Sequence, residues 1–235
     1  MKAIISDKKE IAKGTLLVEL ELLGERVDFK PGQFFKLELV NPSYTDEKGN
    51  ARLFSIVNSP NQKDVLVMAT RLTDSAFKKS LNELPIGKEA VIENIMGNFT
   101  LPNDNKRPLI LIAGGIGITP FMSMLNYVTE QKLDYKITLI YSNRDKGSTA
   151  FYGELQELAN KNKNIKIILT MTQDPEWKGE NRRVDAQLIK DYIKDLNSST
   201  FMTAGPPQMV TAVVSALKEA GVDEKSIIIE NFGGY

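Results

Sequence analysis

The sequence predicts two domains: an N-terminal antiparallel β-barrel or sandwich, and a C-terminal α/β domain whose parallel sheet is covered by helices. Three observations predict this class. Short β-rich runs separated by turn residues extend to about residue 101, and apolar strands alternate with helical patterns after residue 107. The polar segment 102–107, PNDNKR, separates the β-rich part of the sequence from the part in which strands and helices alternate. We therefore predict domains at 1–103 and 104–235.

The β-rich runs of the first domain have the alternation and composition of strands. They are residues 15–22, 34–40, 53–57, 64–72 and 89–95. The turns between them contain Pro31-Gly32, 48–50, 59–61 and 85–87. Only 75–84 has a helical pattern. Strands at such spacing predict an antiparallel barrel or sandwich.

In the second domain, strands are predicted at 109–113, 136–142, 165–172, 199–205 and 226–232. Helices are predicted at 120–132, 149–162, 185–195 and 207–220. Regular alternation of this kind predicts a parallel sheet with helices on both faces. Ligands of such sheets bind beyond the carboxyl ends of the strands, where the strand order reverses.

The stretch Leu109 to Leu125, LILIAGGIGITPFMSML, predicts a strand, a tight turn and a helix. Glycines at 114, 115 and 117 let a ligand approach the backbone, and Thr119 and Pro120 suit the N-cap and first helical position. The helix start would attract a phosphate. The stretch matches neither the G-x-G-x-x-G fingerprint nor a P-loop, so on its own it leaves open a glycine-rich connection without function.

Composition narrows the chemistry. The thirty basic and thirty acidic residues give a net charge of zero, so the overall charge does not favour binding to nucleic acid. The sequence contains no apolar run long enough to predict insertion into a membrane. The chain has no cysteine and no histidine, which removes the commonest nucleophiles, general bases and metal ligands. We predict no metal site, a cytoplasmic location, and chemistry carried by a bound organic cofactor.

Several short motifs follow one another along the chain: Pro31-Gly32-Gln33-Phe34, Arg52-Leu53-Phe54-Ser55, Gly97-Asn98-Phe99, GGIGITP, AGPP and the ending ENFGGY. In this order they resemble the ferredoxin–NADP reductase superfamily of flavin and pyridine-nucleotide oxidoreductases. The resemblance covers essentially the whole chain. It implies a flavin-binding β-barrel followed by a Rossmann-like nucleotide-binding domain.

For the barrel, the resemblance implies FAD as cofactor. Arg52 would pair with a flavin phosphate, Phe54 would lie against the isoalloxazine, and Ser55 would offer its hydroxyl near the reactive nitrogen. The stretch Met68 to Arg71 would follow the ribityl chain. The implied contacts are Arg52, Leu53, Phe54, Ser55, Met68, Ala69, Thr70, Lys78, Lys79 and Ser80. Two alternatives stay open: Phe54 as a core aromatic residue, and 78–80 as a solvated helix turn.

For the second domain, the resemblance implies that Thr119 faces the nicotinamide. Ala204 stands where many relatives have a cysteine, and Glu230 with Phe232 resembles a terminal acid and aromatic that close over the flavin. The implied nucleotide contacts are Gly114, Gly115, Gly117, Thr119, Asn143, Arg144, Gly205, Pro206 and Phe232. The implied catalytic set is Ser55, Thr119, Glu230 and Phe232. A last strand followed by a frayed tail is the alternative for the ending.

The function implied is a flavoprotein reductase that passes hydride from NADH or NADPH to FAD. Without cysteine the chain has no iron–sulfur module, so the electron acceptor would be a separate protein, such as ferredoxin or flavodoxin, or a small oxidant. Two alternatives remain: a flavin reductase that releases its flavin, and a non-catalytic nucleotide-sensing module. The sequence leaves the acceptor and the oligomeric state open.

The choice of nucleotide depends on charges beyond the predicted strands. The segment after the second strand contains Arg144 and Asp145, and the next strand is followed by Gln173 and Asp174. Acids at two strand ends would repel the 2′-phosphate of NADPH. On this ground we expect NADH.

Overall fold

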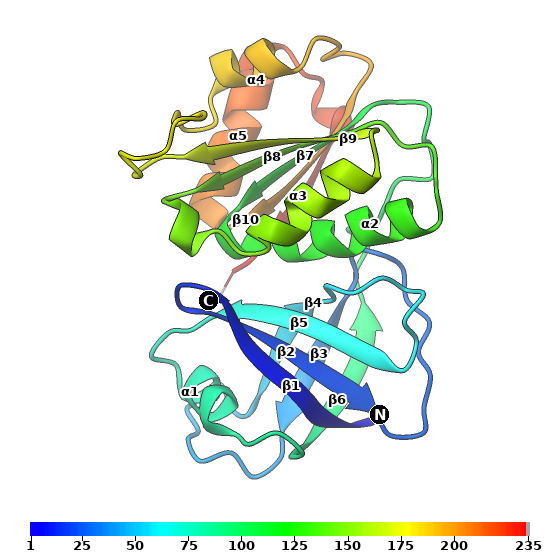
Figure 1. Cartoon of the computed structure of the whole chain (residues 1–235), viewed down its shortest axis with the longest axis vertical. Coiled ribbons are helices and arrows are strands. Elements are labelled where there is room, and N and C mark those ends of the chain that lie inside the picture. Colours follow the sequence, from blue (N-terminus) through cyan, green and yellow to red (C-terminus); the bar gives the residue numbers. More distant parts are fainter. Residues whose placement is uncertain (234–235) are drawn as a thin grey trace.

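The computed structural model describes residues 1–233, so Gly234 and Tyr235 of the ENFGGY ending lie outside the described residues. Figure 1 shows a mainly β domain, with one short helix, below a domain built on a second sheet. The first domain contains β1 (Lys2–Ala12), β2 (Thr15–Leu22), β3 (Phe34–Leu39), β4 (Ala51–Ser55), β5 (Val65–Arg71), α1 (Ala76–Glu83) and β6 (Glu89–Met96). Its antiparallel sheet has the order β4-β3-β6-β1-β2-β5, which confirms the predicted architecture.

The segment after β4 closes the barrel, because it bonds to the other edge strand, β5. Val57 N donates to Val67 O at 2.8 Å, and the side chain of Asn58 accepts from Val67 N at 2.8 Å. The same amide donates to Val65 O at 3.0 Å. The Asn58 side chain thus makes hydrogen bonds to β5 of the kind that a neighbouring strand's backbone would make, and it helps to join the two edge strands.

The first strand, β1, was missed by the sequence analysis. Its sequence, KAIISDKKEIA, is mostly polar because one face lies toward solvent, and shifts in register interrupt its pairing with β2 between Ile5 and Asp7 and between Glu10 and Ala12. A broken alternation of this kind hides a strand from a search for period two. β1 nevertheless has an inner position in the strand order of the sheet, between β6 and β2.

The second domain is the predicted parallel α/β unit. It contains β7 (Leu109–Gly114), α2 (Thr119–Glu130), β8 (Ile137–Asn143), α3 (Tyr152–Lys161), β9 (Ile165–Met171), α4 (Ala186–Tyr192), β10 (Thr200–Gly205), α5 (Pro207–Ala220) and β11 (Ile227–Asn231). Short 3-10 turns occupy Gly115–Ile118, Lys146–Ser148 and Glu224–Ser226. The strand order is β11-β10-β7-β8-β9. Helices α2 and α3 cover the face toward the barrel, and α4 and α5 cover the other (Figure 1).

One of the apolar clusters spans the interface between the two domains. Val57, Ala69 and Phe99 of the barrel half pack in the same cluster as the residues of α2, and the ring centroids of Phe99 and Phe121 lie 5.6 Å apart. The hydroxyl of Ser123 on α2 donates to Asn58 O at 2.7 Å. The segment 97–108, which contains the predicted boundary, connects the two sheets. None of the helices within residues 1–233 is long and apolar enough to cross a membrane.

Candidate functional site

Two glycine-rich turns meet where the strand order reverses. From β7 the chain adds β8 and β9 on one side and then returns to add β10 on the other, which puts the ends of β7 and β10 side by side. A Cβ on Gly117 would come within 2.2 Å of Ala204 O, so only glycine allows this approach. The predicted GGIGITP and AGPP motifs therefore pack on each other at the switch point.

The helix start differs from the prediction. A 3-10 turn, Gly115–Ile118, precedes α2, and α2 begins at Thr119 with Pro120 in second place. Thr119 is not an accepting N-cap: its buried hydroxyl donates to Ile116 O at 2.9 Å, and it lines none of the cavities described below. The first N–H group of α2, that of Thr119, already donates to Ile116 O within the 3-10 turn. The backbone that can face an anion therefore lies one turn earlier, at Gly114 to Ile116, which lines the cavity described next.

A cavity of about 740 Å³, the interdomain cavity, opens beside this turn. Residues of both domains line it: Lys13, Gly14, Arg71, Leu72, Thr73, Lys78, Gly114, Gly115, Ile116, Ser142, Asn143, Arg144, Asp145, Ser148, Thr172, Pro206 and Met209. The predicted residues Gly114, Gly115, Asn143, Arg144 and Pro206 meet here. Gly117 and Gly205 do not line this cavity and instead pack where the two glycine-rich turns contact each other.

The sequence analysis expected Lys78 and the stretch ending at Arg71 along the cofactor, but it missed Lys13 and Gly14 of the β1–β2 turn. Lys13 N donates to Gly147 O at 2.9 Å, and the Arg71 guanidinium donates to Ser148 O at 2.9 Å. Only the docking of the domains brings Lys13 and Gly14 to the cavity, so no local motif could have identified these two residues.

Asn143, at the end of β8, has an amide whose polar atoms lack partners. The residue is 6% exposed, and neither Oδ1 nor Nδ2 makes a hydrogen bond within residues 1–233. Burying an amide without partners is costly, and Asn143 lines the interdomain cavity. Both amide atoms are covered by protein, so a ligand in the cavity could contact them only if the Asn143 side chain moved.

A second cavity of about 480 Å³, the barrel cavity, lies beside β4. Its lining is Asp46, Glu47, Lys48, Ala51, Arg52, Leu53, Phe54, Thr73, Ser75, Lys78 and Gly233. Lys78 lines this cavity and the interdomain cavity, so the two are neighbours. Burial, with a smaller effect of the Arg52 charge, lowers the pKa of the Lys78 ammonium. These cations suit a phosphate chain.

Arg52 is already engaged in the barrel cavity. Its Nη2 donates to both Asp46 carboxylate oxygens, and its Nη1 donates to three carbonyl oxygens, those of Lys48, Gly49 and Ala51. The guanidinium also lies 5.3 Å from the ring centroid of Phe77. A phosphate would have to displace Asp46 or add to the far side of this arrangement.

Phe54 is not the open aromatic plate that the sequence suggested. It is 2% exposed, and its ring packs in the barrel core with its centroid 5.7 Å from that of Phe77. Strand alternation explains the difference, since neighbouring Leu53 points outward and is 45% exposed. Phe54 lines two cavities with very little exposed surface, and the core alternative describes its packing better.

Five other predicted flavin contacts have side chains outside these cavities: Met68, Ala69, Thr70, Lys79 and Ser80. Met68 fills the barrel core and Ala69 the shared interdomain core. The Ser80 hydroxyl donates to Tyr44 O at 2.9 Å and accepts from Tyr44 N at 2.8 Å. Lys79 lies over the Tyr44 ring. Helical and strand periodicity turns these side chains away, which sequence motifs do not reveal.

Three of the four predicted catalytic residues come together. A narrow cavity of about 100 Å³ is lined by Phe34, Leu53, Phe54, Ser55, Glu230, Asn231, Phe232 and Gly233. Phe232 N donates to Gly205 O at 3.1 Å, which fixes the last described segment to the AGPP turn. Burial raises the pKa of the Glu230 carboxyl. Within residues 1–233 no group of three acidic side chains is placed to hold a metal ion.

Comparison with known proteins finds an NAD-binding family model and reductase components that are similar in sequence to this chain. The oxidoreductase NAD-binding domain family matches residues 111–215. One component of the Na(+)-translocating NADH-quinone reductase of Idiomarina loihiensis is 28% identical over 82% of this chain and 47% of its own length. The anthranilate 1,2-dioxygenase electron transfer component of Acinetobacter baylyi is 26% identical over 88% of this chain and 59% of its own. The chain thus spans about half the length of the curated relatives it matches.

The fold has close counterparts among solved structures. The ferredoxin NADP+ reductase of Neisseria gonorrhoeae, solved with bound FAD and NADP, superimposes with a TM-score of 0.82 over 98% of both chains, at 21% identity. The order of a barrel and a parallel α/β domain is the same as that expected from the motifs. The chain therefore shares the two-domain fold of this reductase, and its residues 111–215 match the oxidoreductase NAD-binding domain family.

Proposed function

We propose that this chain is an NAD(P)H-dependent flavoprotein reductase that passes hydride to FAD and electrons onward to a separate acceptor. The observation that carries the proposal is the interdomain cavity, which joins the glycine turn of the parallel sheet to the β1–β2 turn, Arg71 and Lys78 of the barrel. A nucleotide on one wall would meet a cofactor on the other.

The nucleotide's polar groups would face the backbone of Gly114 to Ile116, which lines the interdomain cavity. Gly115 has a φ of +53° and no atom within 4 Å of a built Cβ, so its open side faces cavity space. These features orient a ligand without any side chain reacting.

The flavin would lie along the barrel, with its phosphates among Arg52, Lys48 and Lys78 and its ring near Ser55 and Glu230. When bound, the flavin supplies the hydride-accepting ring that this chain's own side chains lack. Ser55 would hold a hydrogen bond at that ring. Glu230, whose pKa is raised by burial, would lie beside the same ring. Phe232 would exclude water.

Spectroscopy of the purified chain tests the proposal. Yellow protein whose flavin bands bleach under anaerobic NADH or NADPH supports a reductase with bound FAD. A colourless chain that binds nucleotide without reducing added flavin would overturn the proposal and leave a nucleotide-sensing module.

The engaged state of Arg52 favours a second candidate, a flavin reductase that releases its flavin. A carboxylate already bound to the guanidinium competes with a flavin phosphate, which weakens retention of the cofactor. In that case the purified chain is colourless but oxidises NADH or NADPH when free flavin is added. The dissociation constant of FAD separates the two candidates.

We propose a cytoplasmic location, supported by the absence of cysteine, which fits a reducing compartment. For the acceptor we propose a ferredoxin- or flavodoxin-like protein or a small oxidant. A relative named as an electron transfer component of a dioxygenase supports a protein acceptor. A pull-down with the reduced chain from native lysate, followed by reduction of each captured protein, tests this.

A further inference from the structure

The buried hydroxyl of Tyr141 is bonded to the glycine turn. Tyr141 lies on β8 opposite Ala113 of β7, and its side chain is fully buried in the apolar cluster that α2 and α3 cover. From there the hydroxyl donates to Gly115 O at 2.9 Å. Burial raises the pKa of the Tyr141 hydroxyl, so the group stays protonated around neutral pH and remains a donor. The first residue after β7 is thus held from inside the core.

The direction of the Gly115 carbonyl decides the direction of the next N–H group. Residues 1–233 contain no cis peptide bond, and in a planar trans peptide the C=O and N–H bonds point in opposite directions. Because Gly115 O is directed at buried Tyr141, the Ile116 N–H is directed away from the core. Gly115 and Ile116 both line the interdomain cavity, so this N–H lies on the side from which a ligand would approach.

Gly115 has no side chain that could fix this peptide. Its φ is +53°, and no atom lies within 4 Å of a built Cβ. Since glycine adopts many backbone conformations at little cost, the peptide between residues 115 and 116 could rotate and turn its carbonyl toward the cavity. A carbonyl oxygen in that place would repel an anionic ligand, and the N–H donor would be lost. The bond from Tyr141 opposes this rotation.

The next peptide of the turn is anchored as well. Ile116 O accepts from the Thr119 hydroxyl at 2.9 Å and from Thr119 N at the end of the 3-10 turn. Gly117 then packs so closely on Ala204 O that a Cβ would clash with it. The peptides on both sides of the Ile116 Cα are therefore held, the first by Tyr141 and the second by Thr119.

We propose that Tyr141 is a positioning residue of the glycine turn, whose buried hydroxyl keeps the Ile116 N–H directed into the interdomain cavity as a hydrogen-bond donor. This inference rests on the proposed function, in which the nucleotide meets the backbone of Gly114 to Ile116. Tyr141 itself does not belong to the lining of the cavity. Its effect reaches the nucleotide through the peptide between residues 115 and 116.

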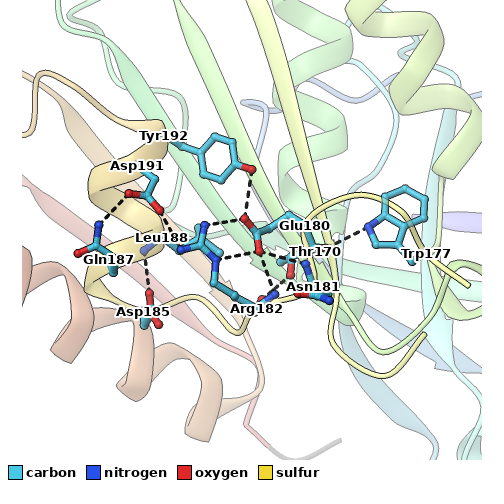
Figure 2. A network of polar contacts seen from close by, with 10 residues as sticks. All are labelled: Thr170, Trp177, Glu180, Asn181, Arg182, Asp185, Gln187, Leu188, Asp191 and Tyr192. Atoms are coloured by element: carbon cyan, nitrogen blue, oxygen red, sulfur yellow. Dashed lines mark hydrogen bonds and ion pairs between the residues drawn. The ribbon is translucent and has the colours of Figure 1, made fainter. Parts of the chain in front are cut away.

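Two other tyrosines of the same domain provide matched controls. The Tyr135 hydroxyl, on a side chain that is also buried, donates to Pro102 O at 2.6 Å. The Tyr192 hydroxyl donates to Glu180 Oε2 at 3.2 Å, in a cluster where Arg182 Nε and Nη2 bind the same carboxylate at 2.9 and 2.7 Å (Figure 2). Neither tyrosine lines the interdomain cavity. Phenylalanine at any of the three positions keeps the ring and removes one hydroxyl bond.

Calorimetric titration of the full chain with NAD⁺ and with NADP⁺ measures the positioning role without turnover. Tyr141→Phe should weaken binding of both nucleotides by the same factor, roughly five- to tenfold, because the Ile116 N–H meets a part that they share. Tyr135→Phe and Tyr192→Phe should lower the stability against denaturant but keep the wild-type dissociation constants. An unchanged dissociation constant in Tyr141→Phe, or an equal loss of affinity in all three variants, would overturn the inference.

The amide resonance of Ile116 provides a readout that a loss of stability does not move. In ¹H–¹⁵N spectra of the full chain, this resonance should shift when NAD⁺ or NADP⁺ is added to the wild type, and the shift should be much smaller in Tyr141→Phe. The wild-type spectrum keeps the inference testable if Tyr141→Phe fails to fold. An Ile116 resonance that does not respond to bound nucleotide would overturn it.

Anaerobic flavin reduction separates this inference from the proposed function. With NADH or NADPH, Tyr141→Phe should need a higher nucleotide concentration than the wild type to reach the same rate of bleaching. Bleaching at wild-type nucleotide concentrations in Tyr141→Phe overturns the inference and leaves the reductase standing. A wild-type chain that neither binds nor oxidises either nucleotide overturns the proposed function, and the inference with it.

Discussion

Arg52 Nη2 donates to both carboxylate oxygens of Asp46, at 2.9 and 3.2 Å, at the edge of the barrel cavity. The arginine that the motif assigns to a flavin phosphate is therefore preorganised by an acid that also competes for it. We therefore predict that Asp46 limits the affinity for flavin, which the motif alone does not indicate.

We expect Arg52→Ala to weaken FAD binding by roughly ten- to hundredfold, because the phosphate loses its guanidinium partner. Asp46→Asn should tighten binding, because the competing charge is gone. Titration of the apo-protein with FAD and with FMN measures both effects. Asp28→Asn, which breaks the exposed pair with Lys63 elsewhere on the barrel, is the control. Preference for FMN, or an unchanged dissociation constant in Arg52→Ala, would contradict this account.

Gly115→Val should slow hydride transfer severely while the flavin content stays the same. The substituted side chain would project into cavity space, where no atom lies within 4 Å of a built Cβ, and it would strain a φ of +53°. Stopped-flow reduction measures the rate. Gly87→Val, at a φ of +86° with equally open surroundings before β6, controls for backbone strain alone. A wild-type rate in Gly115→Val would remove this turn from the mechanism.

Ser123→Ala should destabilise the chain by about 1–3 kcal/mol, because the buried Asn58 carbonyl loses its donor at the domain interface. Denaturant unfolding measures the loss. Ser198→Ala, at an exposed serine whose hydroxyl donates to Asp195 O at 3.4 Å, should change the free energy of unfolding by less than about 0.5 kcal/mol. Equal effects of the two substitutions would show that the interface bond contributes nothing specific.

The free energy of unfolding should depend on pH through Glu180. Its hydrogen bonds with Arg182 hold the carboxyl's pKa at about 2, below the usual 4.5. Because the folded pKa is the lower one, the stabilisation is fully present above about 4.5 and is lost as pH falls toward 2. Glu180→Gln should therefore be less stable than the wild type at neutral pH, and the difference should shrink on acidification. A difference independent of pH would indicate lost packing instead.

The two-domain architecture was readable from the sequence because periodicity is a local property. The run 15–22 is β2, and the pattern at 207–220 is α5, with the predicted bounds. Apolar spacing decides such elements wherever one face is buried. β1 was not predicted, because its exposed face and its irregular register interrupt the alternation of apolar and polar residues that marks a strand.

The glycine turn was also readable, because Gly117 is required by a contact no other residue permits. The sequence therefore determined which strand ends line the interdomain cavity, and it placed Asn143, Arg144 and Pro206 near them. Its motifs could not reveal that Phe54 points into the core or that the Ser80 hydroxyl bonds to Tyr44, because these facts depend on how the strand and helix are turned in the fold.

Only the tertiary structure decided the electrostatics. Asp145 and Asp174 read as repulsive acids in the sequence, yet in the fold their carboxylates cap turns, while Arg183 reaches the same cavity as Arg144. Charge in a sequence is a count, whereas the potential at a site depends on which charges are already paired. The bond from Lys146 N to Asp174 and the approach of Arg183 to Arg144 join segments that meet only when β8, β9 and α4 have assembled.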